Sequence, residues 1–267
     1  LNKVGKGLPL STFLNFVRIM LTSFLTAEWR KLAMVNYTVS PDLLQPFVPK
    51  HTELDLFEGQ CFVSLIGFLF DKVSLLGVPI PFHTTFEEVN LRFYVKHRTK
   101  DGQWKRGVTF VKEIVPKYAV SWVANVVYNE PYVTLPMRHE WQTANEQLRV
   151  SYEWKQKEWN RLELLADATS VPLPAGSLEE FITEHYWGYT KYNNFTTYEY
   201  GVEHPRWEVY PVKTHNVDVN FEAVYGPNFG FLSHQSPHSA LLAEGSAIVV
   251  KLSLIHISEP TRLLRSS

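Results

Sequence analysis

One stretch of the sequence, Thr84–Lys96 (TTFEEVNLRFYVK), places several side chains capable of chemistry at alternate positions. Alternation among β-branched and aromatic residues is typical of a β-strand. One face of this strand is mostly apolar, whereas the other carries a carboxylate, an amide, a guanidinium and a phenol, about 7 Å from one to the next. These four residues are Glu88, Asn90, Arg92 and Tyr94. Such a row is either a solvated outer face or the polar wall of a pocket.

As a pocket wall, this row predicts the binding of a small organic acid or carbonyl compound. Arg92 would pair with a carboxylate through two parallel hydrogen bonds, and aromatic walls would supply apolar contacts. Glu88 or Glu130 would be a general acid or base whose pKa is raised by burial, with Tyr132 or Lys117 assisting. We therefore name Glu88, Asn90, Arg92, Tyr94 and Tyr132 as candidate ligand-binding residues, and Glu88, Glu130 and Lys117 as candidate catalytic residues.

Lys117 has two interpretations. It precedes an apolar segment, Tyr118–Tyr128, and a lysine beside apolar surface can have a lowered pKa and form a Schiff base with a carbonyl compound. Alternatively, its stem lies on the surface and its ammonium group is in water.

Several classes of function find no support in the sequence. The histidines lack the HExxH spacing of zinc enzymes, and His234 and His238 lie in a Ser/Pro-rich stretch, so we expect no metal site. Gly-rich phosphate loops are absent, so we expect no cofactor. The 26 basic and 27 acidic residues are interspersed, which argues against nucleic acid as a partner. Cys61 stands in an apolar run and is interpreted as a buried small hydrophobe.

We predict a single domain over residues 26–251 and treat the two ends of the chain as separate segments. Residues 1–25 include an apolar run, 8–25, interrupted by Asn15 and Arg18, which we interpret as an amphipathic helix packed on the domain and not as a membrane anchor. Residues 252–267 begin with LSLIHISEPTR, which resembles a translated sequencing adapter and is interpreted as a non-native tail. Without an export signal, we expect a cytoplasmic location.

The elements that would position the candidate residues are mostly strands. Strands are expected over 29–39, 132–138, 148–154, 159–168 and 239–250, and hairpins over 53–70, 84–115 and 196–213. Helices are expected over 8–25, 42–48, 118–128 (buried) and 177–189, whereas 217–225 is ambiguous. The apolar loop 74–83 would either plug the end of a barrel or cover a pocket. The pattern predicts an α+β fold, mainly antiparallel, with a strongly bent sheet or barrel and a few packed helices.

Several blocks together resemble the YqjF-like family of uncharacterised proteins, within the acetoacetate decarboxylase-like superfamily. They are Trp29, LDLFEGQCFVSLIGF (54–68), FEEVNLRFYV (86–95), RGVTF (106–110), EEFITEHYWGY (179–189), HPRW (204–207) and AEGS (243–246). The resemblance implies a strongly bent antiparallel sheet around a central cavity, with Glu88 pointing into it. It also implies a catalytic lysine after a proline in a segment comparable to 123–132, but here Tyr132 follows Pro131.

Because that lysine is missing at the expected place, decarboxylase activity is not carried over. Three hypotheses remain open: a non-catalytic pocket protein that binds a small organic acid or carbonyl compound, an enzyme that acts on such a compound by carboxylate acid/base chemistry, and a structural or partner-binding protein. In the third, the cavity would be filled by the protein's own side chains, and Glu88 and Arg92 would form only an internal ion pair.

Overall fold

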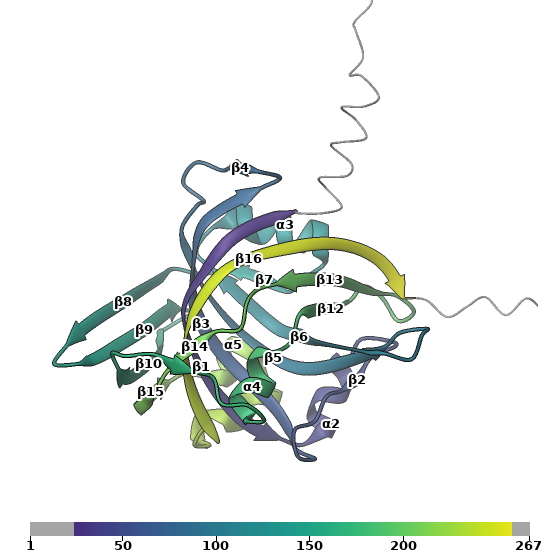
Figure 1. The fold of residues 1–267 in the computed structure, drawn as a ribbon. Helices are drawn as coiled ribbons and strands as arrows, with labels where there is room; N and C mark the ends of the chain where they lie inside the picture. The colour runs from purple at the N-terminus through teal and green to yellow at the C-terminus, as the bar shows by residue number, and fades with distance from the viewer. Residues whose placement is uncertain (1–23, 258–267) are drawn as a thin grey trace, which may run out of the picture.

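A computed structural model describes residues 24–257. Within them, seven strands pair edge to edge in a ring, because the first and the last of them pair with each other (Figure 1). In ring order they are β1 (Leu25–Val39), β3 (Cys61–Leu75), β5 (Phe86–Arg98), β6 (Trp104–Val115), β12 (Trp187–Lys191), β13 (Thr197–Glu203) and β16 (Ser239–Ile257). All neighbours are antiparallel except β6 and β12, which run parallel. The predicted strongly bent, mainly antiparallel sheet is therefore confirmed.

Short strands extend this sheet. They are β2 (Glu53–Leu54) beside β5, β4 (Val78–Pro79) beside β3, β7 (Tyr132–Thr134) beside β6, β14 (Glu208–Tyr210) beside β16 and β11 (Val171–Pro172) beside β14. Two predicted hairpins are wrong. In residues 53–70 only the bridge between Phe57 and Gln60 joins the two arms, since β2 pairs with β5. In residues 196–213, β13 pairs with β12 and β16, whereas β14 pairs with β11 and β16. Turn residues alone do not decide which strands pair.

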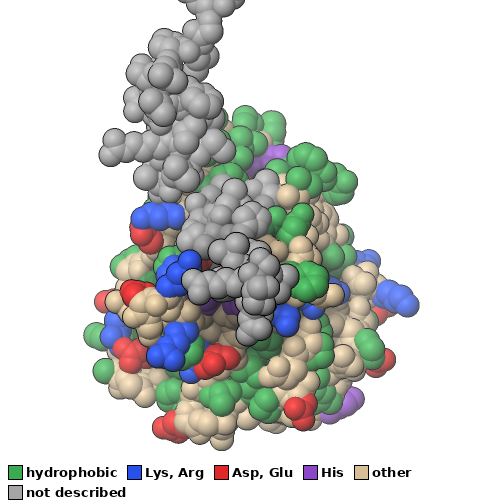
Figure 2. Space-filling model, turned by 90° about the vertical axis from the view of Figure 1, so that its right-hand side faces the viewer, with side chains coloured by type: hydrophobic (Ala, Val, Ile, Leu, Met, Phe, Trp, Pro, Cys, Tyr) green, Lys and Arg blue, Asp and Glu red, His purple; other side chains and the backbone are tan. Residues whose placement is uncertain are grey.

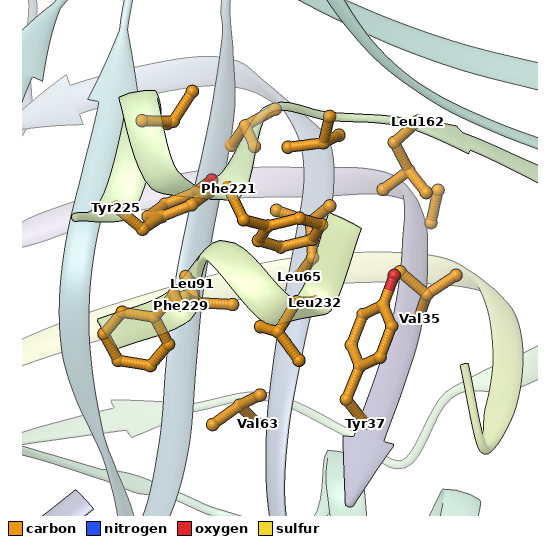
Figure 3. Packing of buried hydrophobic residues seen from close by; sticks show 14 of the residues in the cluster. Val35, Tyr37, Val63, Leu65, Leu91, Leu162, Phe221, Tyr225, Phe229 and Leu232 are labelled. Atoms are coloured by element: carbon orange, nitrogen blue, oxygen red, sulfur yellow. The ribbon is translucent and has the colours of Figure 1, made fainter. Parts of the chain in front are cut away.

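A second sheet covers part of the outer face of the ring. Its strands are β8 (Met137–Ala144), β9 (Gln147–Lys155), β10 (Trp159–Asp167) and β15 (Val212–Asp218). It is followed by α5 (Phe221–Tyr225) and the 3-10 helix η2 (Pro227–His234), so the ambiguous residues 217–225 contain both strand and helix. Figure 3 shows Phe221 of α5 and Leu232 of η2 packed over the ring strands. The covered part of the outer face of the ring is thereby a buried core.

The two faces of β5 enter different cores, as its alternation predicts. Val89, Leu91 and Phe93 have no exposed surface and belong to the core between the ring and the second sheet. Phe86 and Tyr94 belong to the core inside the ring. The polar face of β5 is therefore turned inward and not toward water.

The helices are short. They are α2 (Pro41–Leu44) with the 3-10 turn η1 (Gln45–Phe47), α3 (Tyr118–Tyr128) and α4 (Leu178–Thr183). The predicted burial of α3 is wrong on one face, where Tyr118, Trp122 and Val126 are exposed. The predicted helix 177–189 is wrong beyond Thr183, because β12 begins at Trp187 and pairs with β6 and β13.

Most of the predicted N-terminal helix, residues 8–23, lies outside the described residues, and Leu25 already belongs to β1. At the other end, the backbone of β16 continues to Ile257, so residues 252–257 of the predicted tail pair with β13, and the remainder lies outside the described range. Between residues 24 and 257, no helix has the length and apolar composition needed to cross a bilayer. Acidic and basic side chains are interspersed over the face drawn in Figure 2.

Candidate functional site

The interior of the ring contains a cavity of about 230 Å³. Its walls come from the ring strands, from α3 and from the segment between β4 and β5, which contributes Ile80 and His83. Much of the lining is aromatic: Trp29, Phe68, Phe70, Phe86, Phe110, Trp187, His204 and Trp207. Trp29 lies edge-on to Phe68, with ring centroids 5.3 Å apart, and His204 stacks on Trp207 at 4.3 Å.

The polar row of β5 reaches this cavity at three of its four positions. Glu88, Asn90 and Arg92 line it. Asn90 Nδ2 donates a hydrogen bond of 2.9 Å to Glu88 Oε1. Tyr94 is buried but is not among the lining residues, and its hydroxyl lies 2.6 Å from Ser64 Oγ. Tyr94 therefore packs beside the cavity, with its ring centroid 4.7 Å from that of His185.

Tyr132 and Glu88 form a hydrogen-bonded pair. The Tyr132 hydroxyl donates to Glu88 Oε2 at 2.9 Å. Asn125 of α3 fixes the backbone of Tyr132 by accepting from its N–H at 2.9 Å and donating to its carbonyl at 3.1 Å. The structure thus brings together two residues that lie far apart in the sequence.

Glu130 lies at the end of α3, where Asn129 adopts a left-handed conformation (φ 56°) and ends the helix. Its Oε1 accepts hydrogen bonds from the hydroxyls of Tyr200, at 2.9 Å, and Thr190. Glu130 is 5% exposed and lines the cavity.

A third carboxyl, Glu113 of β6, also lines the cavity and was not predicted. It pairs with Asn90 across the ladder and is 2% exposed. Its Oε2 atom is buried and has no hydrogen-bond partner.

Burial determines the charge state of these three carboxyls. It raises the pKa of Glu88 to about 7, against the opposing effects of its hydrogen bonds and the charge of Arg92. Burial likewise raises the pKa of Glu130 to about 7, although hydrogen bonds from Thr190 and Tyr200 oppose it. Burial and the neighbouring carboxyls raise the pKa of Glu113 well above its usual range. The cluster can therefore hold and exchange protons near neutral pH.

Arg92 and His185 form the cationic and imidazole part of the site. Arg92 Nη2 donates to the carbonyl of Ile182 at 3.3 Å, and its Nε is buried without a partner. His185 follows α4, lines the cavity and lies with its Nε2 3.2 Å from Asp55 Oδ2. Burial, together with the charges of Arg106 and Arg92, lowers the pKa of His185 to about 4, although Asp55 opposes this. His185 is therefore a neutral imidazole at pH 7.

Lys117 is not among the lining residues. It is the N-cap residue of α3. Burial raises the pKa of Glu87, but the hydrogen bond from His139 and, to a smaller extent, the charge of Lys117 lower it, and the net result is a lowered pKa. Glu87 stands on the opposite face of β5 from Glu88. No group of three or more His, Cys, Asp or Glu side chains within residues 24–257 is arranged to hold a metal ion.

Unpartnered polar atoms gather around the cavity. In the described part of the chain, five lining residues each have a buried polar side-chain atom without a hydrogen-bond partner: Trp29 Nε1, Asn90 Oδ1, Arg92 Nε, Glu113 Oε2 and His185 Nδ1. Because such atoms cost free energy when they stay unpaired, their convergence on one cavity indicates a place for a polar ligand.

Comparison with known proteins identifies the family. The family model DUF2071, described as an uncharacterized conserved protein, matches residues 26–247. The chain belongs to this family. It is also 29% identical over 184 residues to the uncharacterized protein YqjF of Bacillus subtilis strain 168, covering 66% of this chain and 72% of that protein. The resemblance to YqjF-like proteins is confirmed.

Solved structures share the fold of this chain. The enduracididine biosynthesis enzyme MppR, complexed with the condensation product of pyruvate and imidazole 4-carboxaldehyde, aligns with 97% of this DUF2071 chain and 98% of its own (TM-score 0.61, 13% identity). Acetoacetate decarboxylase from Legionella pneumophila aligns over 88% and 89% (TM-score 0.58, 12% identity). At these identities the likeness shows the fold alone.

Proposed function

We propose that this DUF2071 protein binds a small organic acid or carbonyl compound in its central cavity. The observation that carries the proposal is Arg92, a guanidinium on the cavity wall whose Nε is buried without a partner. Arg92 is half-buried, its buried Nε lacks an acceptor, and a carboxylate is the natural bidentate partner of a guanidinium. The fold is shared with MppR, which binds a product made from pyruvate, and this likeness supports a ligand of the same size class.

The proposal does not include a Schiff-base lysine. The described residues that line the cavity include no lysine, and the charge of Lys117 acts on Glu87, which is not a lining residue. Pro131 is followed by Tyr132, whose hydroxyl is already bonded to Glu88. These observations favour binding over amine catalysis.

A second candidate function is acid/base chemistry on the same ligand. The pKa values of about 7 for Glu88 and Glu130 favour it, because a group that titrates near the working pH can both donate and accept a proton. Under this alternative, Glu88 would exchange a proton with the ligand, and Tyr132 would orient the carboxyl through its hydrogen bond.

The test is a thermal-shift screen of small carboxylates and ketones, followed by calorimetric titration. Binding raises the unfolding midpoint by mass action, so a ligand should stabilise the protein in proportion to its occupancy. Arg92→Ala should weaken binding of a carboxylate by about 10- to 100-fold, the value of a charge-assisted hydrogen bond. Arg138→Ala is the matched control, because Arg138 is exposed on β8 and its ion pair is with Glu153, away from the cavity lining.

Two outcomes would count against the proposal. Unchanged affinity in Arg92→Ala would remove the guanidinium from the site, and no stabilisation by any carboxylate or ketone would favour the third hypothesis, a structural or partner-binding role. Borohydride trapping with a β-keto acid tests the amine route separately, and we expect no covalent adduct at Lys117.

A further inference from the structure

The hydrogen-bond polarity of His185 is fixed by its neighbours. Asp55, outside the lining residues, accepts from Arg106 Nε at 2.6 Å and lies 3.2 Å from His185 Nε2. Burial raises the pKa of Asp55, but hydrogen bonds from His185 and Arg106 outweigh it and bring the pKa below its usual value. An ionised carboxylate only accepts hydrogen bonds, so Nε2 must carry the proton.

The other nitrogen of this imidazole is therefore a bare acceptor. With Nε2 protonated and the ring neutral, Nδ1 presents a lone pair. The His185 side chain is 1% exposed, and Nδ1 has no hydrogen-bond partner. Protonation of Nδ1 does not remove this unpaired acceptor, because burial and the charges of Arg106 and Arg92 keep the ring neutral. Only a donor from outside the described side chains can satisfy the atom.

Asn90 of β5 has the same polarity. Its amide nitrogen donates to Glu88, so its Oδ1 is an acceptor, and that atom is also buried without a partner. Arg92 supplies a donor: it stands two positions after Asn90 on β5, and its guanidinium contacts the carbonyl of Ile182, three positions before His185. The lining of the cavity thus combines a cationic donor with two neutral acceptors.

We infer that the ligand is an acid that also carries a hydrogen-bond donor, a hydroxyl or an amino group, beside its carboxylate, and that His185 Nδ1 accepts from that donor. The inference rests on the proposed function, in which Arg92 holds the carboxylate. A 2-oxo acid presents only acceptors, so it would leave His185 Nδ1 and Asn90 Oδ1 unpaired. The hydroxyl of a 2-hydroxy acid has one O–H, which His185 Nδ1 would accept, whereas the protonated amino group of a 2-amino acid can donate to both His185 Nδ1 and Asn90 Oδ1.

The size of the cavity limits the skeleton. An apolar cavity of about 150 Å³ accommodates one benzene molecule. The cavity of about 230 Å³ therefore has space for one ring and about 80 Å³ more, enough for a short acid side chain. The aromatic side chains around Trp29 and Trp207, with ring centroids 6.2 Å apart, suit such a ring.

The experiment compares three acids of one skeleton: mandelate, phenylglycine and phenylglyoxylate. Phenylglyoxylate has no hydrogen on the carbon beside its keto group and cannot become an enol, so it remains a pure acceptor. Isothermal titration at pH 7.5 should show that mandelate or phenylglycine binds at least about tenfold more tightly than phenylglyoxylate, the effect of leaving a buried acceptor unpaired. Whichever of the two binds more tightly identifies the donor as hydroxyl or amino.

Three variants assign that preference to His185. His185→Leu removes the acceptor and should abolish the preference, whereas His185→Asn, which keeps an oxygen close to the position of Nδ1, should retain part of it. His97→Leu is the matched control, because His97 also contacts a tyrosine ring but is not among the lining residues. Thermal unfolding of each variant checks that it is folded.

Equal or tighter binding of phenylglyoxylate would overturn the inference, as would a preference for mandelate that survives in His185→Leu. If none of the three acids binds while acetate or pyruvate stabilises the protein, the inference fails and the proposed function stands. If no carboxylate binds at all, the proposed function itself fails.

Discussion

The carboxyl groups inside the ring should make the protein less stable as the pH rises. Glu88 is 2% exposed, and burial, opposed by hydrogen bonds from Asn90 and Tyr132, raises its pKa from 4.5 to about 7. A carboxyl with a raised pKa binds its proton more tightly in the folded protein than in the unfolded chain. Its stabilising effect is therefore complete below the unfolded pKa of 4.5 and is lost as the pH rises through about 7.

The magnitude follows from the size of this pKa change. One pKa unit corresponds to about 1.4 kcal/mol, so a change from 4.5 to about 7 amounts to about 3 kcal/mol in the free energy of unfolding. Glu88→Gln removes the titrating group but keeps an oxygen to accept from Asn90 and offers an N–H toward Tyr132. Relative to the parent, the variant should therefore gain up to about 3 kcal/mol of stability between pH 5 and pH 8.

Denaturant unfolding at constant ionic strength, at pH 5, 6, 7 and 8, measures this gain. The difference between parent and variant cancels the titration of groups that do not interact with Glu88. Glu113 and Glu130 do not cancel, because the charge of Glu88 raises the pKa of both, and its removal in the variant lowers them. Glu140→Gln, an exposed position on β8, is the control and should differ from the parent by a constant amount. A Glu88→Gln difference that does not change with pH would refute the conclusion that this carboxyl is buried as the neutral acid.

Three further changes test the fold. Phe221→Ala should cost about 3–5 kcal/mol of unfolding free energy, because Phe221 of α5 has no exposed surface. The same change at Phe195, which is 79% exposed, is the control and should cost less than about 0.5 kcal/mol. Similar losses in the two variants would contradict the packing in Figure 3. Gly67→Ala should cost about 1–3 kcal/mol in the same assay, since a Cβ at Gly67 would lie 2.8 Å from the Tyr152 ring. No loss of stability would mean that the two sheets lie further apart than in this structure. Ser177→Ala should cost about 1 kcal/mol, because Ser177 Oγ caps α4 by accepting from a backbone N–H, and no loss would show that the cap contributes nothing.

The alternation of β5 was the most reliable signal in the sequence. It separated Val89, Leu91 and Phe93 from Glu88 and Arg92, and these two groups enter different environments. The strand was readable because each of its faces has a uniform character, so a period of two survives whichever strands lie beside it. The residue types of β5 could not show which of its two faces lines the enclosed cavity, since that depends on how the strands close into a ring.

Glu113 shows where such reading ends. A regular hairpin that turns at residues 100–102 and continues the pairing of Arg92 with Phe110 would set Glu113 opposite Val89, on the outward face. The strands instead contain an extra residue, Val111, between the pairs Arg92–Phe110 and Leu91–Lys112. This bulge shifts the register by one, so Glu113 lies opposite Asn90 and points inward. Nothing in the residue types marks the position of the shift.

His185 was missed for a different reason. The capping box at Ser177 and Glu180 correctly predicts the start of α4, with Glu180 N donating to Ser177 Oγ at 3.1 Å. Helix propensity then suggests a continuation through His185. Pairing of Trp187 and Gly188 with β6 overrides that propensity, so His185 falls in the connection between helix and strand, where its ring meets Asp55.

The pairing of β1 with β16 has a consequence for how the chain acquires its structure. Eleven residue pairs join these strands, and their partners are separated by about two hundred positions in the sequence. Contacts of such long range slow folding, because the entropy of closing a large loop is lost before the contacts contribute any stabilising free energy. During synthesis the ring cannot close before β16 has left the ribosome, and until then the apolar residues that line the cavity are open to aggregation.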